Sequence, residues 1–255
     1  MPSRKILFFL IALVASTPAF GDAGAIKVEE SPRAPTSLSK SLAHYIMGII
    51  YDNDSKRDRA VREYKEAVKL EPSESVIHTR LAADYILTHK YDLAMDELKK
   101  AKSIDPTDAR PAFLLALVYT SLRQFDNAQR EYEAVINSYP DSVWALSSLA
   151  DIYILEDKIE EAASVYEKLI LQEKDSAVLY FNLGILYLKL GRVKDAIEKL
   201  RQAETLDPNE PAIKNRLGDI YLKKGLRNKA RYEWQRSLEI DPGQEKIKEK
   251  IKNLN

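Results

Sequence analysis

The three histidines are the side chains of this sequence best suited to bind a metal or to move a proton. His44 and His78 stand 34 residues apart, at equivalent places of two predicted helices. Neighbouring helix axes lie roughly 8–10 Å apart, whereas two zinc ligands must lie within ~4 Å of each other. We therefore interpret both as packing residues. His89 falls at a predicted helix end, where its ring suits the helix dipole, and we predict no metal or cofactor.

Other catalytic arrangements are also missing from the sequence. Asp151 and Asp219 share a predicted helix face but are 68 residues apart, which corresponds to roughly 20 Å between stacked helices. A cooperating acid and base need about 5–9.5 Å. Gly184 and Gly191 follow no predicted strand and precede no Gly-Lys-Ser or Gly-Lys-Thr, so they do not form a phosphate-binding loop. We predict that the protein is not an enzyme.

The residues are instead organised by a repeat of 34 residues that occurs six times. One column of the repeat is always tyrosine: Tyr51, Tyr85, Tyr119, Tyr153, Tyr187 and Tyr221. Nine residues later another column is always alanine: Ala60, Ala94, Ala128, Ala162, Ala196 and Ala230. Two complete columns in the same register establish a repeat architecture.

Each repeat contains two amphipathic helices, because apolar residues recur at spacings of three and four over residues 177–210. Gly191 lies between the two helices and can take the left-handed conformation that ends a helix. A third column is small throughout and lets the two helices approach closely: Gly48, Ala82, Ala116, Ala150, Gly184 and Gly218. Proline ends the second helix in five repeats, at Pro72, Pro106, Pro140, Pro208 and Pro242, with Lys174 as the exception.

This pattern resembles the tetratricopeptide repeat, whose signature is an aromatic residue, leucine-glycine, tyrosine, alanine, a large residue and proline. The fifth copy matches it with Tyr180, Leu183, Gly184, Tyr187, Ala196, Leu200 and Pro208. The resemblance implies an all-α fold, a right-handed superhelical solenoid whose first helices line a concave protein-binding groove. The six repeats are expected at residues 41–74, 75–108, 109–142, 143–176, 177–210 and 211–244. A capping helix is expected at 245–255, with Ile247, Ile251 and Leu254 on one face.

The first 21 residues have the order of a secretory signal peptide, with Arg4 and Lys5 before the apolar run Ile6 to Ala15. We expect cleavage after Gly21, followed by a flexible leader over residues 22–38. The apolar run is shorter than the ~20 residues of a membrane span, although a retained signal anchor is the alternative. The protein is therefore expected to be exported, in the simplest case to the bacterial periplasm and otherwise secreted.

The amino-acid composition of the chain indicates which class of partner to expect. The chain has 39 basic and 39 acidic residues and no cysteine, so it has neither disulfides nor the basic excess that favours nucleic acid. We expect a protein or peptide partner, and no membrane span after signal cleavage.

The family resemblance implies which residues line the groove, and the residues in the middle of the groove are apolar and aromatic. They comprise Tyr45, Ile49, Val76, Phe113, Leu117, Trp144, Phe181 and Ile185. Asn182 and Arg216 match two members of the cluster with which some family members bind a terminal carboxylate, but Ser147, Asp151 and Ala212 replace the others. An exposed stripe of this kind favours partner binding, and packing or coverage by the leader is the alternative. We predict a non-catalytic adaptor or scaffold of the cell envelope; the alternative is a structural subunit that self-associates through the same stripe.

Overall fold

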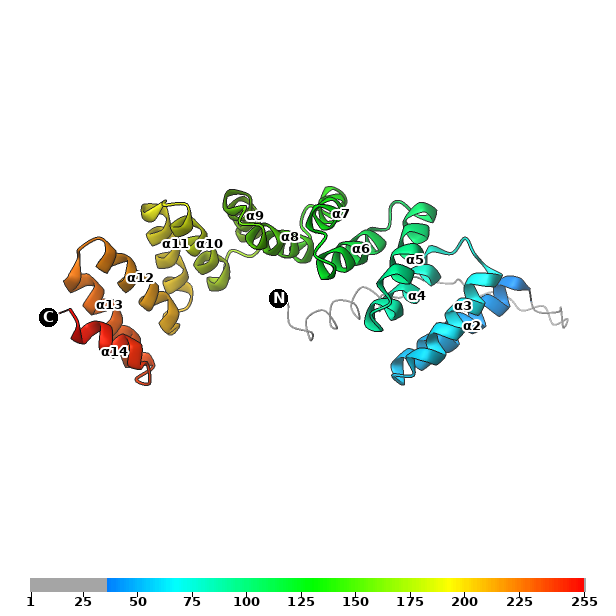
Figure 1. The fold of residues 1–255 in the computed structure, drawn as a ribbon, viewed down its shortest axis with the longest axis horizontal. Coiled ribbons are helices and arrows are strands. Elements are labelled where there is room, and N and C mark those ends of the chain that lie inside the picture. Colours follow the sequence, from blue (N-terminus) through cyan, green and yellow to red (C-terminus); the bar gives the residue numbers. More distant parts are fainter. Residues whose placement is uncertain (1–35, 255) are drawn as a thin grey trace. The chain divides into compact units, whose positions relative to one another are not determined.

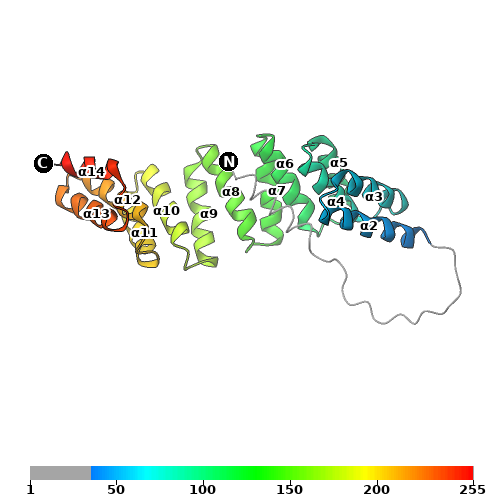
Figure 2. The same ribbon diagram turned by 90° about the horizontal axis from the view of Figure 1, so that it is seen from below.

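The computed structural model describes residues 36–254. The predicted signal peptide and residues 22–35 of the predicted leader lie outside this range. The described part contains thirteen α-helices and no strand, which confirms the all-α fold class (Figures 1 and 2). The chain divides into two compact units at the boundary between Pro140 and Asp141.

Unit 1 (residues up to Pro140) and unit 2 (residues from Asp141) are both built from consecutive helical hairpins. Unit 1 pairs its helices as α2 (Ser37–Asn53) with α3 (Arg57–Leu70), α4 (Ser75–Leu87) with α5 (Tyr91–Ile104), and α6 (Ala109–Ser121) with α7 (Phe125–Ser138). Unit 2 pairs α8 (Val143–Leu155) with α9 (Ile159–Gln172), α10 (Ala177–Lys189) with α11 (Val193–Leu206), and α12 (Pro211–Lys223) with α13 (Arg227–Ile240), and it ends with α14 (Glu245–Lys252). Each unit is thus a short helical solenoid. The right-handed superhelical course stays a prediction.

The turn inside every hairpin has the same backbone geometry. One residue adopts a left-handed conformation in each: Ser55, His89, Arg123, Asp157, Gly191 and Gly225, with φ between 58° and 73°. The next N–H donates to the carbonyl of the column tyrosine, as Lys56 does to Tyr51 at 2.7 Å and Arg192 to Tyr187 at 2.8 Å. This bond closes the last turn of the first helix. The predicted left-handed conformation of Gly191 is confirmed. The same conformation occurs in four hairpin turns where the left-handed residue is not glycine.

The small and large columns form the core of each hairpin. All six column alanines have no exposed surface. At Gly48 an added Cβ would collide with the ring of Tyr64, and at Gly218 with the indole of Trp234. The small residue of the first helix therefore lies directly against the large residue of the second helix in the same hairpin.

Helices lie at both ends of the residues that the structure describes. α2 begins at Ser37, inside the segment expected to be a flexible leader, because the Thr36 hydroxyl accepts a hydrogen bond from the Ser39 N–H and caps the helix. The predicted capping helix is present as α14, which ends at Lys252; Ile247 of this helix and Leu254 beyond its end are buried in one cluster with Trp234. Within residues 36–254 no helix combines the length and the apolar content that a bilayer span requires.

Candidate functional site

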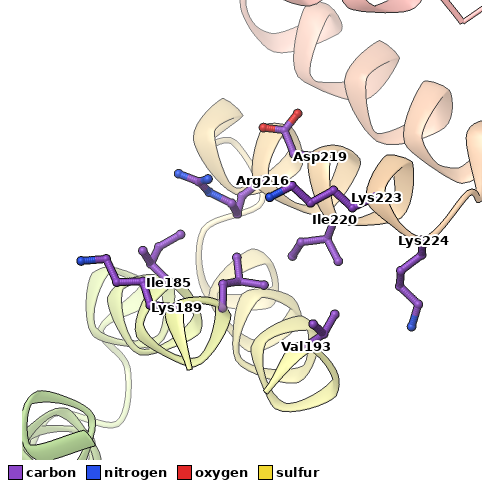
Figure 3. Close-up of a pocket in the computed structure, with 9 residues that line it drawn as sticks. Ile185, Lys189, Val193, Arg216, Asp219, Ile220, Lys223 and Lys224 are labelled. Atoms are coloured by element: carbon purple, nitrogen blue, oxygen red, sulfur yellow. The ribbon is translucent and has the colours of Figure 1, made fainter. Parts of the chain in front are cut away.

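A pocket of about 520 Å³ lies in unit 2, where α10, the start of α11 and α12 meet (Figure 3). Its lining consists of Ile185, Leu188, Lys189, Val193, Arg216, Asp219, Ile220, Lys223 and Lys224. The volume falls within the range of small ligand sites, roughly 300–1,000 Å³. The pocket is therefore large enough to hold several side chains of a bound peptide.

The floor of the pocket is aliphatic and rests on the core of unit 2. It is formed by Ile185, Leu188, Val193 and Ile220. Ile220 is buried within a cluster that also contains Leu200, and Leu188 and Val193 pack against that cluster. Because this floor is fixed by core packing, the pocket is formed before any ligand enters.

Cationic side chains surround this floor. Lys189, Arg216, Lys223 and Lys224 line the pocket, and none of the four forms an ion pair with another residue in the part of the chain that the structure describes. The single acidic lining residue, Asp219, is neutralised by Lys250 of α14, whose Nζ lies 2.5 Å from Asp219 Oδ1. The rim thus carries an uncompensated positive charge.

Several of the predicted groove residues lie in unit 2 and remain accessible. Ile185 and Arg216 line the pocket together. Trp144 is 46% exposed on α8, and Phe181 is half-buried and packs on the cluster beneath the pocket floor. The Asn182 side-chain amide lies 3.4 Å from the Tyr166 hydroxyl, so its hydrogen bond is made within the protein.

The predicted groove residues of unit 1 are mostly buried, and the expectation of an exposed stripe is wrong there. Phe113 and Leu117 are only 5% and 6% exposed. The Phe113 ring packs edge-on against Tyr132 of the same hairpin, with the ring centroids 5.7 Å apart. Tyr45 is 9% exposed, and its ring packs against Tyr64 in a tilted arrangement with the ring centroids 5.9 Å apart. These side chains belong to the core, while Ile49 and Val76 are half-buried.

Of the three histidines, all in unit 1, only His78 is buried, whereas His44 is half-buried and His89 is exposed in a hairpin turn. His44 lies 2.7 Å from a carboxylate oxygen of Glu63. His78 is 2% exposed, and its two ring nitrogens contact Glu97 and the Pro72 carbonyl. Residues 36–254 contain no group of three or more histidine, aspartate or glutamate side chains placed to hold a metal.

Sequence reasoning missed the part of the pocket nearest the hairpin turns. Lys189 was not predicted, although it follows Ile185 by four residues and therefore lies on the same helix face. Arg216, Ile220 and Lys223 follow one another at spacings of four and three on α12. Reading this periodicity to the ends of both helices identifies the rim cations except Lys224, which follows the last residue of α12.

Comparisons with known proteins agree with this architecture. Three tetratricopeptide repeat models match residues 42–74, 119–184 and 186–225. These matches together cover just over half of the chain. The search of curated proteins found no match.

Solved structures with the same fold include MamA, at 20% identity and a TM-score of 0.61, over 67% of this chain and 93% of that chain. YrrB, described as a TPR protein with an unusual peptide-binding site, is 18% identical with a TM-score of 0.57, over 68% and 89% of the two chains. Pseudomonas aeruginosa pilF is 16% identical with a TM-score of 0.57, over 84% and 97%. Six copies of the repeat, their hairpin structure and these matches show that the chain belongs to the tetratricopeptide repeat family.

Proposed function

We propose that this protein is a non-catalytic adaptor that holds a peptide segment of a partner protein in the pocket between α10 and α12. The observation that carries the proposal is a preformed pocket of about 520 Å³ with an aliphatic floor. Tetratricopeptide repeats are generally protein-interaction modules, and the related fold of YrrB is described as having a peptide-binding site. A groove lined by helix faces binds peptides through a few anchoring side chains.

We further propose that the adaptor works in the cell envelope, in the simplest case in the bacterial periplasm. The signal-peptide order of residues 1–21 supports this location. Amino-terminal sequencing of the exported protein tests it, since cleavage after Gly21 leaves Asp22 as the first residue. A species that keeps the first residues and needs detergent for extraction would indicate a retained anchor instead.

Photo-crosslinking tests the binding role. A photoreactive amino acid at Ile185, in the pocket floor, is expected to crosslink to a partner protein in envelope extracts. The control position is Tyr232, which is 58% exposed on α13 and does not line the pocket. Crosslinks that are equally frequent at both positions, or absent from Ile185, would refute a binding function for this pocket.

The second candidate function is a structural subunit that self-associates. The exposure of Trp144, at 46%, is the observation that favours it. Light scattering distinguishes the two functions, because a purified monomer supports the adaptor and a concentration-dependent oligomer supports the subunit.

A further inference from the structure

The charges around the pocket indicate the chemistry of its occupant. We propose that the pocket binds an internal acidic segment of the partner, with one aliphatic side chain on the floor and at least two side-chain carboxylates on the rim. This inference rests on the proposed adaptor function and adds the class of ligand. Its basis is charge complementarity, since Lys189, Arg216, Lys223 and Lys224 line the pocket while Asp219 is already paired with Lys250.

The distribution of the cations favours more than one carboxylate in the ligand. Figure 3 shows the ammonium groups of Lys189 and Lys224 at opposite edges of the apolar floor. On α12, Arg216 and Lys223 are seven residues apart, and their backbone attachment points are therefore separated by ~10 Å at 1.5 Å per residue. A carboxylate paired with the cation at one edge leaves the cation at the opposite edge unpaired. Acidic side chains about three residues apart in an extended segment span this distance at ~3.3 Å per residue.

The floor requires an aliphatic residue between those carboxylates. Ile185, Leu188, Val193 and Ile220 offer an aliphatic surface whose side chains contain no hydrogen-bonding group. A leucine, isoleucine or valine can bury its side chain there without leaving a polar group unpaired.

The same surface disfavours nucleic acid. The lining contains no aromatic residue, so unpaired bases find no stacking platform. The whole chain has a formal net charge of zero, and a backbone of phosphates is bound by more extended basic surfaces. An acidic peptide with an apolar anchor uses both the cations and the floor.

The test measures peptide binding to the full mature chain by fluorescence anisotropy. The probe is a capped, labelled heptapeptide with one leucine flanked on each side by three glutamates. We expect saturable binding that weakens at least tenfold when the glutamates are replaced by glutamines, and again when the leucine is replaced by serine. Raising the salt concentration from 50 to 500 mM is expected to weaken binding, because exposed charges are screened.

Matched variants assign the binding to the pocket. Arg216→Glu with Lys223→Glu is expected to reduce the affinity at least tenfold. Lys168→Glu with Lys174→Glu makes the same change of charge at exposed positions of unit 2 that do not line the pocket, and it is expected to leave affinity within twofold. Equal losses in both variants, or no saturable binding of the glutamate peptide to the unaltered chain, would overturn the inference.

Three competing ligands test whether the pocket has a different occupant from the one proposed. A heptapeptide with a free carboxyl terminus is expected to bind like the capped one, and preferential binding of the free form would assign the site to terminal carboxylates. Stronger competition by a single-stranded oligonucleotide, or by a peptide of residues 22–35 of this chain, would equally overturn the inference.

The identity of the crosslinked segment tests the ligand class separately from the proposed adaptor function. Mass spectrometry of the adduct at Ile185 is expected to identify an acidic segment with an aliphatic residue. A neutral or basic segment would overturn the ligand class while retaining the adaptor function. The absence of an adduct would refute the adaptor function itself.

Discussion

A buried carboxyl pair in unit 1 predicts that this unit loses stability as the pH rises. Asp84 of α4 is 3% exposed. Burial, the negative charge of Asp52 and a hydrogen bond to Asp52 raise the pKa of Asp84 to about 8. Asp52 in turn accepts a hydrogen bond of 2.7 Å from the Tyr64 hydroxyl. The folded protein therefore keeps Asp84 protonated at neutral pH.

The direction of the effect follows from proton linkage. The pKa of Asp84 is raised above its unfolded value of 3.8, so the folded state binds more protons than the unfolded state between these two values. Its contribution to stability is therefore lost as the pH rises through this window. Each pH unit in which the folded state keeps this extra proton lowers the free energy of unfolding by about 1.4 kcal/mol, and Asp84 in the folded state is half ionised at about pH 8. The free energy of unfolding of unit 1 should therefore fall by about 2 kcal/mol between pH 6 and pH 8.

Replacing Asp84 by asparagine removes this titration while preserving the size of the side chain. We expect Asp84→Asn to lose the ~2 kcal/mol decrease between pH 6 and pH 8. Hydrogen exchange of residues 36–140, corrected for the intrinsic pH dependence of exchange, measures the effect in the full chain. Asp96→Asn, at an exposed position of α5, is the control and should retain the decrease.

His78 is a second buried titratable group of unit 1, and it is present in all three proteins. Burial lowers its pKa, but hydrogen bonds to Glu97 and to the Pro72 carbonyl outweigh burial and raise the pKa above the usual value. Its contribution to stability is also lost as the pH rises through the folded pKa. The difference between the unaltered chain and Asp84→Asn therefore isolates the carboxyl pair. Identical slopes in these two proteins would refute the reasoning.

Three further predictions concern the repeat architecture. Asp157→Gly should raise the free energy of unfolding by about 0.5–1 kcal/mol in urea titrations, since glycine tolerates its left-handed backbone, and Gly191→Ala should lower it. Gly218→Ala should cost about 1–3 kcal/mol in the same titrations, because the added methyl group collides with the indole packed against it. Removing the residues after Pro242 should accelerate hydrogen exchange first in residues 211–240, which lose their covering helix; unchanged exchange would show that this helix is dispensable.

Much of the fold could be predicted from the sequence because each repeat encodes the same local structure. The tyrosine and alanine columns set the pairing of helices, and the small residues at Gly48 and Gly218 mark where the second helix lies close. The left-handed turns at His89 and Arg123 could not be predicted from residue type. They follow from the hydrogen bond to the column tyrosine, which every hairpin makes.

The candidate site was predicted only in part because equivalent positions differ in burial. Phe113 and Phe181 occupy the same place in their repeats, yet Phe113 is buried against Tyr132 and Phe181 is half-buried. Burial depends on the side chains of neighbouring helices, which the repeat pattern does not specify. Ile185 and Arg216 were predicted, and the structure adds the cationic rim.

Nuclear magnetic resonance of isoleucine methyl groups tests most directly whether this pocket takes up a peptide. Ile185 and Ile220 line the pocket, whereas Ile159 and Ile77 are buried elsewhere. Titration of the purified protein with the leucine-centred glutamate heptapeptide should shift the methyl signals of Ile185 and Ile220 saturably and leave those of Ile159 and Ile77 in place. Saturable shifts centred on Ile77, or none at Ile185 and Ile220, would contradict the assignment of the pocket.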